Sequence, residues 1–206
     1  MTIQAVVFDI GRVLIHWEPE AFYDAQIGET RRNAFFSEVP MHQTNLDIDA
    51  GAPWKETVYA LAEAHPDWAT EIRWWHDRWL EMASPVIPQS ARLLRALKAK
   101  GVQVFALSNF GVGTFELAAQ EYPVLNEFDQ PYVSGYLGCV KPDAAIYEKL
   151  EEGSGLNGAA LLFADDRPEN IEAAAARGWQ THLFDQPDAF AARLVAEGLL
   201  TAAESA

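Results

Sequence analysis

The sequence predicts an α/β fold: a doubly wound, parallel, Rossmann-like sheet with a small helical cap inserted after the first strand. Short apolar runs without polar alternation end at polar or turn residues, as strands buried on both faces do. Stretches of helical period separate most of these runs, and strands that alternate with helices form parallel sheets through right-handed crossovers. We expect an α/β core of residues 1–17 and 86–206 and a helical cap of residues 18–85.

The expected elements follow in chain order. Strands are expected at residues 3–8, 102–107, 161–164 and 181–184. Residues 90–101 repeat leucine at helical spacing and end at a glycine, which predicts a helix. The segments PDAAIYEKLEEG (142–153) and PENIEAAAARG (168–178) each open with proline and close with glycine. That asymmetry is typical of helix ends, so two further helices are expected there.

The expected cap is helical in pattern and rich in aromatic residues. It holds five of the seven tryptophans of the chain: Trp54, Trp68, Trp74, Trp75 and Trp79. Large aromatic side chains dominate packing where they are buried, so we expect these to form a helical core rather than a binding surface. The two prolines of SPVIP (84–88) favour a hinge back to the α/β part.

Composition and charge narrow the possible functions. Among the 206 residues, 30 are acidic and 15 are basic, which gives a net charge of −15. That field repels nucleic acids and anionic membranes, so neither is expected as a partner. The single cysteine, Cys139, excludes an intramolecular disulfide and a cysteine-cluster zinc site. Without a long apolar run or a basic N-terminal lead, we expect a cytoplasmic protein that is a monomer or weak homodimer.

Polar residues stand where the expected strands end, and one lysine precedes the third strand. In chain order they are Asp9, Ser108, Asn109, Lys141, Asp165 and Asp166. Ligands of an open parallel sheet bind beyond the carboxyl ends of its strands, so we expect these side chains to converge. Mg²⁺ takes one or two carboxylates plus phosphate oxygens, while lysine and serine stabilise the remaining phosphate oxygens. The set favours Mg²⁺-dependent phosphoryl transfer on a small phosphorylated substrate.

Each of these residues alone also has an ordinary structural explanation. Asp9 fits a strand-end turn, and Ser108 with its neighbour is common turn chemistry. Lys141, which we expect to open a helix, is explained alone as a solvated lysine. The sequence DRPE (166–169) resembles a capping box that needs no catalysis. Their shared order along the chain is what favours a common site.

The ordered motifs VVFDIGRVL, ALSNF, KPDAAIY and LLFADDRPENIEAA resemble those of the haloacid dehalogenase superfamily of hydrolases, which are mostly phosphatases. The resemblance spans nearly the whole chain, with residues 18–85 corresponding to the small helical cap. It is strongest to the bacterial sugar-phosphate phosphatases with an FDxGxV first motif, such as the alpha-D-glucose-1-phosphate phosphatases. The resemblance implies Mg²⁺-dependent hydrolysis of a small phosphorylated metabolite, a sugar phosphate in particular, through an aspartyl-phosphate.

The resemblance also implies roles for the residues that bind and attack the phosphoryl group. Asp9 would be the nucleophile. Ser108 and Lys141 would hold the phosphoryl group, and Asn109 would position the phosphate or the substrate beside it.

A second set of roles concerns the metal. By resemblance, Mg²⁺ would be bound by Asp9, the backbone carbonyl of Gly11 and Asp166, with Asp165 close by. Asn170 would help to hold the metal-binding residues in place.

Gly11 departs from the pattern of many phosphatases in the superfamily, which carry there a second aspartate as general acid and base. Loss of such a group costs roughly 10²- to 10⁴-fold in rate, although the FDxGxV phosphatases share the gap. His16, whose ordinary interpretation is a loop histidine, and His42 of the cap are candidate substrate-binding residues, and both are candidate proton donors. We expect residues 41–49 to face the site. The gap also predicts a preference for a sugar 1-phosphate over the matching 6-phosphate, since its leaving oxygen is more acidic.

Two alternatives remain open at the level of sequence. A 2-haloacid dehalogenase uses the same aspartate and also lacks the second one, but it needs neither a metal nor the pair Asp165 and Asp166. A non-catalytic phosphate-binding protein would explain the glycine at position 11, although the other elements are all present.

Overall fold

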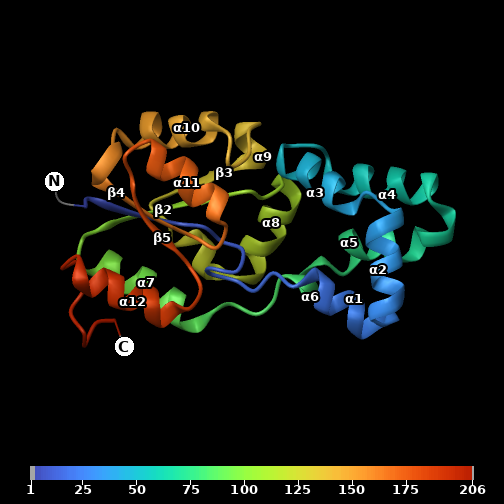
Figure 1. Cartoon of the computed structure of the whole chain (residues 1–206), viewed down its shortest axis with the longest axis horizontal. Helices are drawn as coiled ribbons and strands as arrows, with labels where there is room; N and C mark the ends of the chain where they lie inside the picture. The colour runs from blue at the N-terminus through green and yellow to red at the C-terminus, as the bar shows by residue number, and fades with distance from the viewer. Residues whose placement is uncertain (1–2, 206) are drawn as a thin grey trace.

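Five parallel strands form one sheet in the order β3-β2-β1-β4-β5 in the computed structural model, which describes residues 3–205 (Figure 1). The strands are β1 (Ala5–Phe8), β2 (Gln103–Ser108), β3 (Gln130–Val133), β4 (Leu161–Asp165) and β5 (Gln180–Leu183). The chain runs from β1 to one side of the sheet and then crosses to the other. This arrangement confirms the predicted doubly wound, Rossmann-like class.

Helices cover both faces of the sheet. They are α7 (Pro88–Ala99), α8 (Val112–Glu121), α9 (Ser134–Leu137), α10 (Ala144–Ser154), α11 (Pro168–Ala176) and α12 (Pro187–Ala196), with short 3₁₀ turns η2 (Pro123–Asn126) and η3 (Gly158–Ala160). Val6 and Phe8 of β1 pack on the face covered by α7 and α12, whereas Ala5 and Val7 pack on the face covered by α10 and α11 (Figure 1). Because β1 lies between two covered faces, it is apolar without alternation.

The two edge strands depart from the sequence prediction. β3 was not expected, because Pro131 within QPYV interrupts a strand pattern. Proline is tolerated at a sheet edge, where one side of the strand needs no hydrogen-bonded neighbour. β5 was expected to be buried on both faces, yet its residues are half-buried or exposed, because it forms the opposite edge.

A separate group of helices lies to one side of the sheet (Figure 1). They are α1 (Pro19–Ile27), α2 (Glu29–Glu38), α3 (Met41–Asp49), α4 (Trp54–Ala64), α5 (Ala69–Asp77) and α6 (Trp79–Met82), with the 3₁₀ turn η1 (Pro66–Trp68). These helices share an apolar cluster of their own that includes Tyr23, Phe35, Trp68 and Trp75. None of the helices within residues 3–205 combines the length and the apolar character that a membrane crossing needs.

Two connecting segments join this helical group to the sheet and are hydrogen bonded to each other. The backbone N–H of His16 donates to the carbonyl of Pro85 at 2.9 Å, and that of Ile87 donates to the carbonyl of Leu14 at 2.8 Å. The segments therefore form a short paired ribbon rather than two loose linkers.

The far end of α3 contacts the sheet domain at a second point. Ser134 Oγ donates to the backbone carbonyl of Asp49 at 2.6 Å. Gly51, with φ of 109°, approaches Gly135 so closely that a Cβ on it would lie 2.9 Å from the Gly135 oxygen. The approach of these two backbone segments requires glycine.

Candidate active site

Three polar side chains meet where neighbouring strands end. Asp9 follows β1, Ser108 ends β2 and Asp165 ends β4, and β1 pairs with both of the other strands. In a parallel sheet these ends lie at the same edge, so the predicted convergence is present in the structure.

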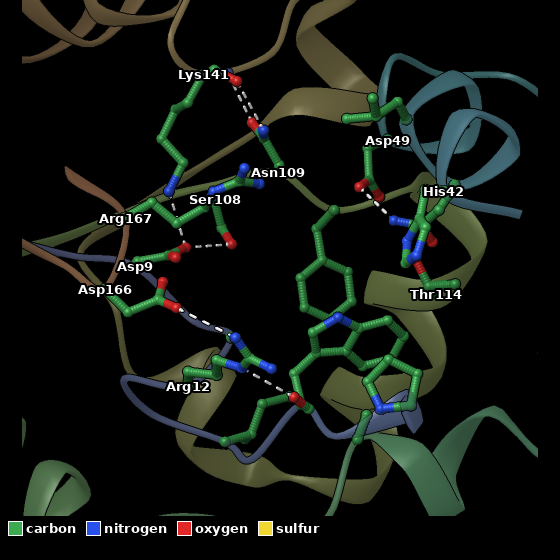
Figure 2. Close-up of a pocket in the computed structure, with 18 of the residues that line it drawn as sticks. Asp9, Arg12, His42, Asp49, Ser108, Asn109, Thr114, Lys141, Asp166 and Arg167 are labelled. Atoms are coloured by element: carbon green, nitrogen blue, oxygen red, sulfur yellow. Dashed lines mark hydrogen bonds and ion pairs between the residues drawn. The ribbon is translucent and has the colours of Figure 1, made fainter. Parts of the chain in front are cut away.

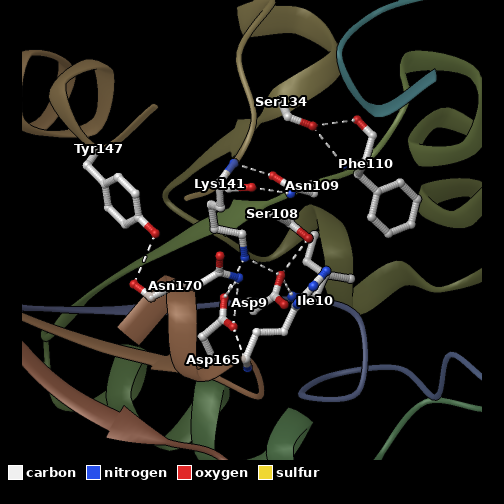
Figure 3. A network of polar contacts seen from close by, with 11 residues as sticks. Asp9, Ile10, Ser108, Asn109, Phe110, Ser134, Lys141, Tyr147, Asp165 and Asn170 are labelled. Atoms are coloured by element: carbon white, nitrogen blue, oxygen red, sulfur yellow. Dashed lines mark hydrogen bonds and ion pairs between the residues drawn. The ribbon is translucent and has the colours of Figure 1, made fainter. Parts of the chain in front are cut away.

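Asp9 is the centre of the contacts at this edge (Figure 3). Its Oδ1 accepts hydrogen bonds from the backbone N–H of Ile10 and from Ser108 Oγ, both at 2.7 Å, and lies 2.9 Å from Lys141 Nζ. Its Oδ2 receives no hydrogen bond from residues 3–205. Burial raises the pKa of Asp9 to about 6, against the effect of Lys141 and with a contribution from Asp165. One oxygen is thus held in place while the other stays available.

Lys141 is buried with only 4% of its surface exposed, and its Nζ bridges Asp9 and Asp165. The distance to Asp165 Oδ2 is 2.6 Å. Burial alone would lower the pKa of Lys141, but the two carboxylates raise it above its ordinary value, so the ammonium stays charged. Lys141 does not open a helix, contrary to the sequence prediction, because α10 begins at Ala144 and the lysine lies in the preceding turn.

Asn109 holds the turn that carries Lys141. Its Oδ1 accepts from the backbone N–H of Lys141 at 2.7 Å, and its Nδ2 donates to the carbonyl of the same residue at 2.9 Å. Asn109 lines the cavity as expected, but both ends of its amide are engaged by the protein. Its geometry is that of a residue that positions the lysine.

Asp165 is fully buried, and both of its carboxylate oxygens accept hydrogen bonds. Besides Lys141, the backbone N–H of Arg167 donates to its Oδ1 at 2.8 Å, and Asn170 Nδ2 lies 3.0 Å from each oxygen. A carboxylate with both oxygens engaged in this way serves mainly to hold its neighbours. Asn170 also lines the cavity, and its side-chain amide is used to hold Asp165.

Asp166 differs from Asp165, because its carboxylate is half-buried and faces the cavity (Figure 2). The capping box that would have explained DRPE without catalysis does not form: Arg167 is the N-cap of α11, and no side chain caps that helix end. The nearest cation is Arg12, whose Nη1 lies 4.0 Å from Asp166 Oδ2. Burial and Asp165 raise the pKa of Asp166 above its ordinary value. Its charge is therefore only weakly compensated by the described residues.

A divalent cation fits these carboxylates. Asp9, Asp165 and Asp166 each place one oxygen within 4.8 Å of the others. Oδ2 of Asp9 and the carboxylate of Asp166 have oxygens to spare, which is the hard-donor set that Mg²⁺ prefers. Gly11, whose backbone carbonyl the family resemblance implies as a further metal ligand, also lines the cavity.

A cavity of about 500 Å³ opens above these residues, between the sheet edge and α3 (Figure 2). His42, Asn45, Leu46 and Asp49 line it from α3. This agrees with the expectation that residues 41–49 face the site. His16 does not join them: it is exposed and is not part of the cavity wall.

Aromatic side chains complete the wall of the cavity. Trp75 and Trp79 are 1% and 4% exposed and belong to apolar clusters, as expected of packing residues, yet both also line the cavity. Trp17 packs against both, with ring centroids 5.6 Å away in each case. The expected helical core thus extends to the cavity surface, so the same residues pack the core and line the cavity.

Sequence reasoning did not single out Asp49 as a site residue. Its side chain lines the cavity although only 8% of the residue is exposed, and its Oδ2 accepts from Asn45 Nδ2 at 2.8 Å. Burial raises its pKa to about 7, with the backbone of Gly111 and Asn45 acting in the opposite direction. The signal was present in the sequence: His42, Asn45 and Asp49 share one helical face at spacings of three and four residues.

Comparison with known proteins finds relatives named as a phosphatase and a dehalogenase. Sesquiterpene phosphatase astK of Aspergillus oryzae is 27% identical over 199 residues, which cover 89% of this chain and 91% of the relative. Haloacetate dehalogenase H-2 of a Moraxella species is 29% identical over 93 residues, covering 45% of this chain and 42% of the relative.

Solved structures share the fold. A HAD family enzyme of Bacteroides thetaiotaomicron superposes with a TM-score of 0.73 at 20% identity, covering 92% of this chain and 99% of that chain. The same enzyme in complex with magnesium and inorganic phosphate superposes with a TM-score of 0.69 at 18% identity, covering 89% and 94%. The family model for haloacid dehalogenase-like hydrolases matches residues 3–178 of the chain. The chain therefore belongs to the haloacid dehalogenase-like hydrolases.

Proposed function

We propose that this protein is a Mg²⁺-dependent phosphatase that hydrolyses a small phosphorylated metabolite through an aspartyl-phosphate. The observation that carries the proposal is the environment of Asp9. Its Oδ1 is fixed by three donors, its Oδ2 has no donor among residues 3–205, and Ser108 and Lys141 lie beside it below the cavity. A carboxylate held in this way is oriented for attack and surrounded by groups that stabilise phosphoryl oxygens.

In the first step Asp9 attacks phosphorus, the bond from phosphorus to the ester oxygen breaks, and the alcohol leaves. Water then attacks phosphorus, the bond to Asp9 breaks, and inorganic phosphate and the free carboxylate are released. Lys141 balances the negative charge of Asp9 and of the incoming phosphate. Ser108 donates its hydroxyl hydrogen to Asp9 Oδ1 in the structure and lies beside the carboxylate that would receive the phosphoryl group.

Asp9, the backbone carbonyl of Gly11 and Asp166 would hold the metal, and Asp165 would fix Lys141 beside them. Bound there, Mg²⁺ supplies charge stabilisation for the phosphoryl oxygens. The net charge of −15 makes such a cation necessary, because a phosphate ester is otherwise repelled by the surrounding carboxylates.

Residues 18–85 act in this proposal as a cap that selects the alcohol. A sugar phosphate is the first candidate substrate, because His42 presents a polar ring near the aromatic wall of Trp75 and Trp79. Aromatic faces and polar side chains together suit a hydroxylated ring.

A phosphate ester of an apolar alcohol is the second candidate. Leu46, Phe110 and the tryptophan wall give the cavity a substantial apolar surface. The relative named sesquiterpene phosphatase is similar over most of both chains, which supports an apolar alcohol as a class to test.

The test is a panel of phosphate esters measured with Mg²⁺ and with a chelator. It contains sugar 1-phosphates and 6-phosphates, aryl phosphates and an isoprenoid phosphate, with a haloacid as the dehalogenase control. Mg²⁺-dependent release of phosphate is expected. Release of halide without a metal, or turnover of no ester at all, contradicts the proposal.

A further inference from the structure

The proposed phosphatase lacks a carboxylic acid two residues after its nucleophile, where Gly11 stands. The cavity nevertheless contains a carboxyl that faces the nucleophile from the cap side. Asp49 comes from the end of α3 and lies across the cavity from Asp9 (Figure 2). It is held there by Asn45 Nδ2, and its backbone carbonyl is fixed by Ser134 of the sheet domain.

We propose that Asp49 is the general acid and base of the reaction, supplied by the cap in place of the residue missing at position 11. This inference rests on the proposed phosphatase function. In phosphoryl transfer the attacking and leaving oxygens lie roughly in line on opposite sides of phosphorus. A group that protonates the leaving oxygen must therefore face the nucleophile across the substrate. Asp49 lies on that side of the cavity, whereas His16 lies outside it.

The proton balance of the reaction then closes on Asp49. As Asp9 bonds to phosphorus and the ester bond breaks, the Asp49 carboxyl gives its proton to the departing oxygen and becomes a carboxylate. That carboxylate next takes a proton from the water that attacks the aspartyl-phosphate. Phosphate leaves, Asp9 is free again, and Asp49 is protonated for the next cycle.

The surroundings of Asp49 keep a proton on its carboxyl near neutral pH. Burial is the main cause of its raised pKa, and the charge of Asp9 adds to it. Lys141, Asn45 and the backbone of Gly111 act in the opposite direction, and His42 is the other titratable residue of α3 at the cavity. A general acid is most effective when its pKa lies near the working pH.

Gly11 offers a way to test the substitution of one acid for the other. A Cβ at this position would have Trp17 Cβ as its nearest neighbour at 3.8 Å, and its φ is not in the left-handed region. The backbone at position 11 therefore has room for the Cβ of an aspartate. If Asp49 supplies the proton, the carboxyl introduced by Gly11→Asp should restore activity to a variant that lacks the Asp49 carboxyl.

The experiment compares two probes that differ by one methylene: p-nitrophenyl phosphate, whose leaving phenol is acidic, and p-nitrobenzyl phosphate, whose leaving alcohol is not. In Asp49→Asn, which keeps the oxygen that accepts from Asn45, we expect kcat/KM for the benzyl ester to fall by about 10²-fold or more. The fall for the phenyl ester should be at least tenfold smaller, because its leaving oxygen needs little protonation. Asp47→Asn, an exposed neighbour on α3, is the matched control and should change neither value.

The double variant Gly11→Asp/Asp49→Asn should recover benzyl ester hydrolysis relative to Asp49→Asn. Equal losses of kcat/KM on both esters in Asp49→Asn overturn the assignment of Asp49. So does a double variant that recovers no hydrolysis of the benzyl ester, provided that both proteins keep the wild-type thermal unfolding temperature. Absence of turnover in the wild type on both esters and on the substrate panel would instead contradict the proposed function itself.

Discussion

The side-chain amide of Asn109 and the backbone of Lys141 exchange two hydrogen bonds, of 2.7 and 2.9 Å. Through this pair, the end of β2 holds a turn that belongs to a distant part of the sequence. The lysine that must reach Asp9 is thereby fixed through its main chain, and only its side chain has to extend into the site.

The first prediction is that Asn109→Ala lowers kcat by about 10²-fold, the loss expected when a catalytic group is displaced by about 1 Å, and changes KM much less. Steady-state kinetics on a turned-over ester measure both values. Asn126→Ala, which removes an exposed amide bonded only to the carbonyl of Ala119, is the control. A rise in KM with unchanged kcat would mean that Asn109 contacts the substrate, as the sequence alone suggested.

The second prediction concerns the nucleophile. Asp9→Asn should abolish turnover, because a carboxamide does not attack phosphorus and is a poor ligand for Mg²⁺. Acid quenching of the wild-type enzyme during turnover, followed by peptide mass spectrometry, should find a phosphoryl group on the peptide that contains Asp9. Near-normal turnover by Asp9→Asn would show that the assigned chemistry is wrong.

The third prediction separates the two adjacent aspartates. Asp165→Asn leaves Lys141 buried without one of its two carboxylate partners, which costs about 3–5 kcal/mol and should lower the unfolding temperature by roughly 10 °C. Asp166→Asn removes a carboxylate that only Arg12 approaches, so it should leave the unfolding temperature nearly unchanged. It should raise the Mg²⁺ concentration needed for half-maximal activity by about 10- to 100-fold. Calorimetry and Mg²⁺ titration distinguish these effects, and equal behaviour of both variants contradicts the prediction.

The fourth prediction is a dependence of stability on pH. The pKa of Asp49, raised to about 7, means that the folded protein keeps a proton that the unfolded chain releases near pH 4. The folded state then binds more protons between these values, so this group makes the free energy of unfolding fall as pH rises, by about 1.4 kcal/mol per pH unit. Denaturant unfolding with a chelator should show that Asp49→Asn gains stability relative to the wild type between pH 5 and 8. A constant difference across this range would contradict the raised pKa.

The sequence predicted the fold where local pattern and burial agree. The buried strands β1, β2 and β4 were expected at nearly their observed bounds, because strands covered on both faces must be apolar throughout. β3 was missed, since the tolerance of Pro131 depends on its place at the sheet edge, which a local pattern does not contain. The capping box that DRPE (166–169) resembles does not form, and the reason again lies in the folded position of its residues. Its aspartate faces the cavity, and the backbone N–H of Arg167 is satisfied by Asp165 instead.

The candidate site was predictable in part for a similar reason. Asp9, Ser108 and Asp165 follow strands, and the topology of a parallel sheet brings strand ends together. Asp49 follows no strand, and its approach to the cavity depends on how α3 packs against residues more than 80 positions away, such as Ser134. Helical spacing places Asp49 on the same face as His42 and Asn45, but its raised pKa is set mainly by burial, which local sequence does not contain.

The paired connecting segments have a consequence for how this protein could diversify. His16 with Pro85, and Ile87 with Leu14, are joined through backbone groups, so these hydrogen bonds do not depend on particular side chains. The helices between the two segments can therefore accumulate substitutions where they do not contact the sheet domain, whereas the end of α3, held at Ser134 and Gly135, is constrained. Substitutions at cavity positions of these helices other than Asp49 would then change the alcohol that the proposed phosphatase accepts, while Asp9, Ser108 and Lys141 of the sheet domain stay in place.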